Sequence, residues 1–176
     1  DPVGMRGAQF HGGETGLAGV RVYVDADNDD TFDAGEPSSV TDSGGIYTIG
    51  NLLAGTYTVR TDLSTIPAGY AQTFDLDGIA TADEASVPLA AGQIRGDADF
   101  GYVELGAIAG TVLADTDNND TGDAPLSGVT VTLKDGAGND IDSDDVTPGV
   151  QPTTTTTAGD GSYSFTNLAP GTYQVV

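Results

Sequence analysis

The sequence predicts an all-β protein, and three features of the chain lead to that class. Glycine accounts for 26 of the 176 residues, and good helix formers are sparse. Short segments with alternating polar and apolar residues recur between clusters of Gly, Pro, Asn and Asp, as expected for short strands joined by turns. A long segment of the first half also returns near the C-terminal end, which indicates two related modules. We therefore expect small β-folds in tandem.

Alternation and β-branched residues predict the individual strands of the first module. The clearest of them contains GVRVYV and directly precedes a run of acidic residues. A polar loop is expected at 75–86. The expected strands are 5–10, 17–24, 46–49, 56–60, 66–74, 87–90 and 98–103, the first of them at a sheet edge.

The chain contains an internal repeat. Residues 157–175 match 41–59 without a gap, and 126–133 resemble 17–24. The offsets are 116 and 109, so the second copy has about seven extra residues between the two matches. A self-match of this length indicates a tandem duplication. We place the modules at 1–103 and 104–176.

A Leu-x-x-Gly-x-Tyr pattern occurs in both copies and ends at Tyr57 and Tyr173. A tyrosine two residues after a corner glycine can bury its ring and return its hydroxyl to the corner backbone. We expect a structural tyrosine corner in each module.

The strongest functional signal is the segment 25–36, DADNDDTFDAGE. Acidic residues occupy loop positions 1, 3, 5, 9 and 12, where alternate side chains can turn inward. Ca²⁺ takes six to eight oxygens at about 2.3–2.6 Å, including a position-7 carbonyl and a bidentate position-12 Glu. Without a cation, two carboxylates about 5 Å apart cost roughly 0.8 kcal/mol even in water. The predicted calcium ligands are Asp25, Asp27, Asp29, Thr31, Asp33 and Glu36.

A solvated acidic turn is the alternative for this segment, but it does not predict the regular spacing that ends in Glu. Position 6 is Asp30, where helix-flanked calcium loops need Gly. The preceding residues also have a strand pattern rather than a helical one. We therefore expect a calcium loop between strands.

A second acidic segment, DTDNNDTGD at 115–123, precedes the repeated strand instead of following it. Position 12 is Leu126, so the bidentate Glu is missing and we expect weaker calcium binding. The predicted ligands are Asp115, Asp117, Asn119, Thr121 and Asp123. A distant carboxylate could complete the shell, although a solvated loop explains the candidates equally well. Those candidates are Asp135, Asp140, Asp142, Asp144 and Asp145.

Charge and composition limit the partners. Five Lys and Arg against 27 Asp and Glu give a net charge of −22, which repels nucleic acid and anionic membrane surfaces. No apolar run approaches 18 residues, so we expect no membrane insertion. The absence of Cys and the single His11 leave no disulfide and no credible zinc centre.

Together these motifs resemble the B-type repeat domains of serine–aspartate-repeat surface adhesins. The resemblance covers nearly the whole chain, and it implies Ig-like or prealbumin-like β-sandwich modules that are extracellular, stabilised by Ca²⁺ and strung in tandem. The second module stops at Val176 inside its Gly-Thr-Tyr strand. Either it is a fragment, or a neighbouring subunit completes it by strand addition. The motifs lie at 25–37, 41–47, 51–52, 55–57, 67–70 and 99–102.

The expected function is structural: a calcium-stabilised spacer or building block of a surface adhesin or extracellular filament. Its partners would be neighbouring repeats or subunits, with any host or matrix ligand left open. The alternative is a carbohydrate- or protein-binding accessory module of a secreted multidomain protein. Trp is absent and most Tyr fall at expected core positions, which ranks that alternative second. An enzyme is not expected, because one His in a Gly-rich segment offers no Ser–His–Asp set.

Overall fold

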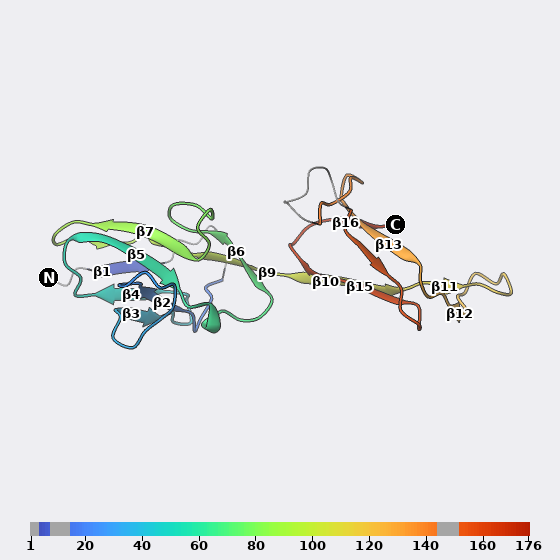
Figure 1. Ribbon diagram of the computed structural model, residues 1–176, viewed down its shortest axis with the longest axis horizontal. Helices are drawn as coiled ribbons and strands as arrows, with labels where there is room; N and C mark the ends of the chain where they lie inside the picture. Colours follow the sequence, from blue (N-terminus) through green and yellow to red (C-terminus); the bar gives the residue numbers. More distant parts are fainter. Residues whose placement is uncertain (1–3, 8–14, 144–151) are drawn as a thin grey trace. The chain divides into compact units, whose positions relative to one another are not determined.

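The fold was taken from a computed structural model, which describes residues 4–7, 15–143 and 152–176 (Figure 1). Its described residues form strands and one short 3₁₀ helix, η1 (Leu63–Thr65), with no α-helix among them. The predicted all-β class is therefore confirmed. In the part of the chain that is described, no helix has the length and apolarity needed to cross a bilayer. The chain divides into two compact units, Asp1–Val103 and Glu104–Val176.

The first unit contains two principal sheets and one additional strand pair. The four-stranded sheet has the order β3-β2-β5-β7 and is antiparallel throughout. Its strands are β2 (Arg21–Val24), β3 (Ser38–Val40), β5 (Gly55–Thr61) and β7 (Glu84–Leu89). The three-stranded sheet β4-β1-β8 consists of β1 (Gly4–Gly7), β4 (Tyr47–Gly50) and β8 (Ile94–Arg95). The additional pair is β6 (Tyr70–Phe74) with β9 (Gly101–Glu104).

A single apolar core joins the two principal sheets. Val22 and Val59 of the four-stranded sheet belong to the same buried cluster as Tyr47 and Ile49 of β4. Strand β7 alternates strictly, with Ala85, Val87 and Leu89 buried and the residues between them exposed. Burying a Val or Leu side chain contributes roughly 1.5–3 kcal/mol relative to leaving it exposed. The first unit is thus a small sandwich held by the inward-facing half of each strand.

Two strand predictions need correction. The segment 5–10 was expected at a sheet edge, but β1 lies in the middle of its sheet, where Met5 pairs with Ile49 on one side and Arg95 on the other. Residues 8–10 lie outside the described residues. The strand expected at 87–90 begins earlier, at Glu84, because the pairing with β5 continues to Arg60. Strand β3 (Ser38–Val40) was not predicted, because a segment of three residues is too short to show the polar–apolar alternation of a strand.

The second unit has a three-stranded sheet, β14-β13-β16, and two strand pairs, β10-β15 and β11-β12. Val131, Leu133 and Phe165 are buried together, with Ile108 and Tyr173 packed against them. The consecutive threonines at 153–157 supply β14. The strands are β10 (Gly106–Thr111), β11 (Leu113–Ala114), β12 (Ala124–Pro125), β13 (Thr130–Asp135), β14 (Thr154–Thr156), β15 (Ser162–Leu168) and β16 (Tyr173–Val175).

Both expected tyrosine corners are confirmed. The Tyr57 hydroxyl donates to the Leu53 carbonyl at 2.8 Å, and the Tyr173 hydroxyl donates to the Ala169 carbonyl at 2.7 Å. The connection before each corner passes through a left-handed asparagine, Asn51 with φ 61° and Asn167 with φ 58°. The two units therefore share local geometry at this corner.

Candidate metal centres

The first acidic loop connects β2 to β3 and is built on a carboxylate at its first position. Asp25 follows the last residue of β2, and only 4% of its surface is exposed. Its Oδ1 accepts a hydrogen bond from the Asn28 N–H at 2.7 Å, and its Oδ2 accepts one from the Asp30 N–H at 3.3 Å. The loop therefore wraps around the Asp25 carboxylate.

Left-handed backbone makes this wrapping possible. Asn28 has φ 58° and Asp30 has φ 66°. Asn and Asp enter this region more readily than other residues with a side chain, because their short polar groups bond to the nearby backbone. Asp30 thus meets the conformational demand that Gly meets at position 6 of helix-flanked calcium loops.

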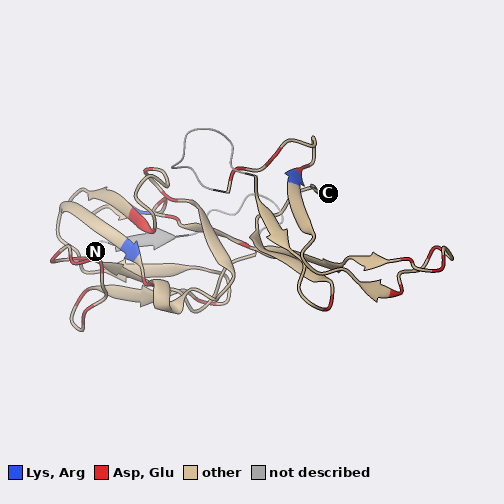
Figure 2. Ribbon diagram, turned by 45° about the vertical axis from the view of Figure 1, so that its right-hand side comes forward, with Lys and Arg blue, Asp and Glu red and all other residues tan. Residues whose placement is uncertain are grey.

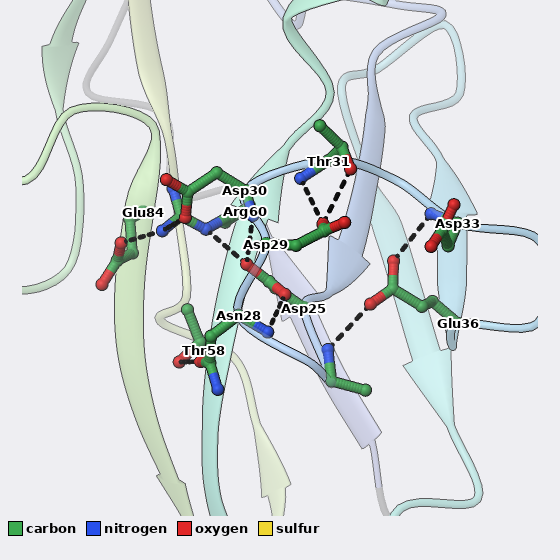
Figure 3. Close-up of polar contacts among 11 residues, drawn as sticks. Asp25, Asn28, Asp29, Asp30, Thr31, Asp33, Glu36, Thr58, Arg60 and Glu84 are labelled. Carbon is green, nitrogen blue, oxygen red and sulfur yellow. Dashed lines mark hydrogen bonds and ion pairs between the residues drawn. The ribbon is translucent and has the colours of Figure 1, made fainter.

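The carboxylates of Glu36 and Asp29 also accept hydrogen bonds from other residues of the same loop. Glu36 accepts from the Ala26 N–H at 2.8 Å and from the Asp33 N–H at 3.0 Å, which links both ends of the loop (Figure 3). Asp29 accepts from the Thr31 N–H at 2.9 Å and from its hydroxyl at 2.7 Å.

Three of the six predicted ligands converge. Carboxylate oxygens of Asp25, Asp27 and Asp29 lie within 4.8 Å of one another. Oxygens bound to one Ca²⁺ at about 2.3–2.6 Å lie at most about 5 Å apart, so this separation fits a single ion. The pKa of Asp27 is raised, first by loss of surrounding water and then by the charges of Asp29, Glu36, Asp33 and Asp25. The donor set is therefore hard, anionic and under mutual repulsion, which suits a divalent cation.

An aromatic contact fastens the loop to the outer face of the sheet. The Phe32 ring meets the buried Tyr23 ring edge-on, with 5.6 Å between centroids. The Arg21 guanidinium lies 4.4 Å from the Phe32 centroid. Burial, with the charge of Asp25, raises the pKa of Tyr23 to about 12. The loop is thus attached at Phe32 as well as at its two ends.

Sequence reasoning missed one member of this site, Arg60. Its Nε lies 2.8 Å from Asp25 Oδ2, and its Nη2 forms ion pairs with Asp30 and Glu84 (Figure 3). Arg60 pairs with Tyr23 of β2 and with Glu84 of β7, so its position depends on strand register. The sequence did contain one signal. The whole chain has only five Lys and Arg, so each basic residue was a candidate partner for the acidic loops.

The second acidic loop connects β11 to β12 and repeats the same local design. Asn118 has φ 57° and Asp120 has φ 65°. Asp115 accepts from the Asn119 N–H at 3.2 Å and from the Asp120 N–H at 2.9 Å. The Asn119 side-chain oxygen accepts from the Thr121 N–H at 2.9 Å and also from its hydroxyl.

Asp123 makes the closing contact that Glu36 makes in the first loop. Its Oδ2 accepts from the Thr116 N–H at 2.7 Å and from the Thr116 hydroxyl at 2.8 Å. These hydrogen bonds lower the pKa of Asp123, the backbone N–H most strongly. Oxygens of Asp115, Asp117 and Asp123 lie within 4.8 Å of one another, so this set also fits one ion.

Two of the distant carboxylates proposed to complete the second loop, those of Asp135 and Asp140, have other contacts. Asp135 accepts from the Ala137 and Asn139 N–H groups of its own turn. Asp140 pairs with Lys134 at 2.6 Å. The backbone of Asp142 forms an isolated β-bridge with Pro152. Asp144 and Asp145 lie outside the described residues.

Acidic residues are concentrated in loops rather than along strands, as Figure 2 shows for the described chain. Residues 106–176, which include the second acidic loop, match the family model described as "SdrD B-like domain". This part of the chain is therefore similar to SdrD B-like domains. It spans nearly the whole second unit, and the predicted resemblance is confirmed.

Relatives extend the similarity beyond residues 106–176 to most of the chain. Serine-aspartate repeat-containing protein D of Staphylococcus aureus (strain Newman) is 36% identical over 171 residues, which is 93% of this chain and 12% of that protein. Serine-aspartate repeat-containing protein F of Staphylococcus epidermidis is 31% identical over 171 residues, 92% of this chain and 9% of that protein. The Bacillus anthracis TIE protein aligns with 99% of this chain and 28% of its own, at 19% identity and a TM-score of 0.44.

Proposed function

We propose that this chain is a calcium-stabilised structural building block of an extracellular surface protein, made of two copies of one Ig-like module. One observation carries the proposal: each unit has a loop of the same local conformation that gathers three carboxylate oxygens within 4.8 Å. Neighbouring repeats or subunits are the implied partners, and the cell surface is the implied location. The similarity to serine-aspartate repeat-containing proteins supports this assignment.

Calcium would be held by Asp25, Asp27 and Asp29 in the first loop and by Asp115, Asp117 and Asp123 in the second. Glu36, Asp33, Thr31, Asn119 and Thr121 are the further oxygen donors predicted for the two loops. The ion would supply positive charge where the chain has a large excess of negative charge. The protein contributes loops whose backbone already turns the carboxylates toward a common point.

A structural role follows from the small size of the cores. Small domains bury a limited fraction of their surface and are marginally stable. A ligand present at 100 times its dissociation constant adds about 2.7 kcal/mol when it binds only the folded state. Extracellular calcium modules typically bind at about 10⁻⁴–10⁻³ M, which suits a location outside the cell.

Thermal unfolding with and without calcium tests the proposal. We expect excess Ca²⁺ to raise the Tm by on the order of 10 °C relative to EDTA, since about 1 kcal/mol shifts a 60–100-residue domain by about 4–8 °C. Asp27→Asn and Asp117→Asn should each remove part of that gain, whereas Glu104→Gln, an exposed acid outside both loops, should not. Equal Tm values in Ca²⁺ and EDTA, together with no heat of calcium binding, would reject the function.

A further inference from the structure

We propose that Arg60 is an internal cation of the first acidic loop. It holds the segment 25–36 in shape when no metal is bound, and it weakens the binding of calcium there. The first loop would then stay folded over a range of calcium concentrations in which the second loop depends on the ion. The affinity half of this inference rests on the proposed function, whereas the metal-free half does not.

The Arg60 guanidinium contacts three carboxylates, as a bound metal cation would. Its Nε lies 2.8 Å from Asp25 Oδ2, and Nη2 contacts both Asp30 and Glu84 (Figure 3). The Asp25 side chain is 0% exposed and that of Arg60 is 16% exposed. Hydrogen bonds between ionised groups are stronger than neutral ones, and screening by salt is weak at buried positions.

Register places this guanidinium where it can act on the loop. Arg60 lies in β5, opposite Tyr23 of β2 on one side and Glu84 of β7 on the other. The loop leaves β2 two residues after Tyr23, so Asp25 and Asp30 come within reach of the same side chain. Arg60 thereby links the loop to two strands that are already paired in the sheet.

The same contacts oppose a second cation. Both oxygens of Asp25 already accept hydrogen bonds, Oδ1 from Asn28 and Oδ2 from Asp30 and Arg60. A calcium ion that uses Asp25 must share this carboxylate with a guanidinium or displace it. The positive charge of Arg60 also repels the ion across a short distance at a partly buried site.

The second loop has no such cation. Lys134 is the only basic residue of 104–176, and it pairs with Asp140. Among the described residues, no Lys or Arg forms an ion pair with Asp115, Asp117 or Asp123, and all three acids are exposed. Repulsion in this loop is offset only by backbone and side-chain N–H and O–H donors.

The experiment uses the full chain in an Asp117→Asn background, which isolates the first loop. Arg60→Gln and Arg60→Lys are compared with Arg95→Gln, a control that removes an Arg–Asp pair of the same unit away from the loop. Calorimetric titration with CaCl₂ gives the affinity. Amide hydrogen exchange of 25–36 in EDTA gives the order of the metal-free loop.

We expect Arg60→Gln to tighten calcium binding by about tenfold or more and to accelerate exchange in EDTA, with neither change in Arg95→Gln. Arg60→Lys keeps the positive charge but loses the planar, multi-donor guanidinium. Its calcium affinity and its exchange rate in EDTA should therefore lie between those of Arg60→Gln and the parent. If Arg60→Gln is unfolded in EDTA, refolding by added CaCl₂ supports the inference, and Arg60→Lys then supplies the affinity comparison.

Unchanged or weaker calcium binding by Arg60→Gln would overturn the affinity half of the inference. Unchanged exchange in EDTA would overturn the metal-free half. If neither the parent nor Arg60→Gln binds calcium, the proposed function fails and the affinity half fails with it. Exchange in EDTA still decides whether Arg60 orders the loop, so the two failures are distinguishable.

Discussion

At the scale of single residues, the Tyr57 corner shows why a Leu-x-x-Gly-x-Tyr pattern recurs. The hydroxyl returns to the Leu53 carbonyl, and the ring lies 3.8 Å from where a side chain on Gly55 would begin. At Gly171 the corresponding distance to the Tyr173 ring is 3.6 Å. Both distances are ordinary van der Waals contacts, so the ring packs against the glycine backbone, and the hydroxyl fixes the corner that starts the next strand.

Removal of this hydroxyl should destabilise the first unit without changing its fold. We expect Tyr57→Phe to lower the free energy of unfolding by about 1 kcal/mol, because a neutral hydrogen bond contributes about that much. Urea denaturation measures the change. Tyr70→Phe is the control, since Tyr70 lines a surface groove of the same unit instead of a corner. Equal losses in the two variants would contradict a specific role for the corner.

Asp62 gives a prediction for acid pH. Although desolvation opposes it, hydrogen bonds from Ser64 and Arg21 lower its pKa below the ordinary value of 3.8. A carboxyl group with a lowered pKa stabilises the folded state above its unfolded pKa, and that contribution disappears as pH falls through the folded pKa. Asp62→Asn should therefore cost about 1 kcal/mol at pH 7 and much less below pH 3.

Denaturant unfolding of Asp62→Asn and the parent from pH 7 down to pH 2.5 checks this expectation. The difference between the two proteins should be constant above about pH 5 and should shrink toward zero in acid. A difference that does not depend on pH would contradict a role for the Asp62 charge, because an Asn side chain can still accept the bond from the Ser64 N–H that caps η1 at 3.0 Å.

At the scale of the element, the acidic loops depend on backbone conformation as much as on charge. Asp30 and Asp120 have φ values of 66° and 65°. Unlike Asp30, Asp120 forms no ion pair with the described Lys and Arg side chains, so it isolates the conformational requirement. A β-branched residue is strongly disfavoured in this region, whereas Gly and Asn are accommodated.

Substitutions at Asp120 should therefore rank by backbone preference. We expect Asp120→Gly and Asp120→Asn to keep the stability of the second unit within about 0.5 kcal/mol of each other. Asp120→Val should lose about 1–2 kcal/mol relative to Asp120→Asn. Thermal unfolding in Ca²⁺ and in EDTA measures these differences. If Val and Asn were equally stable, a left-handed residue would not be required at this position.

Features that depend on spacing within one loop could be predicted from the sequence. Features that depend on the pairing of distant strands could not. The positions of Asp25, Asp27 and Asp29 follow from alternation within one loop, and they converge as expected. Arg60 reaches Asp25 only through the β2–β5 register, which no local pattern contains. Asp123 makes the contact of the missing position-12 Glu because it directly precedes β12, and the pairing of β12 with β11 brings it beside Thr116. Long-range register is also why the central place of β1 was not predicted.

At the scale of the whole molecule, the excess of negative charge sets how the protein should respond to salt. The chain carries 27 acidic and 5 basic residues, so repulsion outweighs attraction when no divalent cation is bound. The screening length falls from about 30 Å in 0.01 M salt to about 3 Å in 1 M salt. Monovalent salt should therefore partly replace calcium in relieving repulsion, although it cannot reproduce coordination.

In EDTA, we expect KCl from 0.01 M to 1 M to raise the Tm by several degrees, because self-repulsion destabilises the compact state. In saturating Ca²⁺ the same change should have a smaller effect, since the carboxylates nearest one another would already be neutralised. Tetramethylammonium chloride is the control, because a bulky cation screens charge but does not enter an oxygen-lined loop. A Tm that falls with salt in EDTA would show that pairs such as Arg60–Asp25, and not repulsion among the acids, dominate the electrostatic free energy of folding.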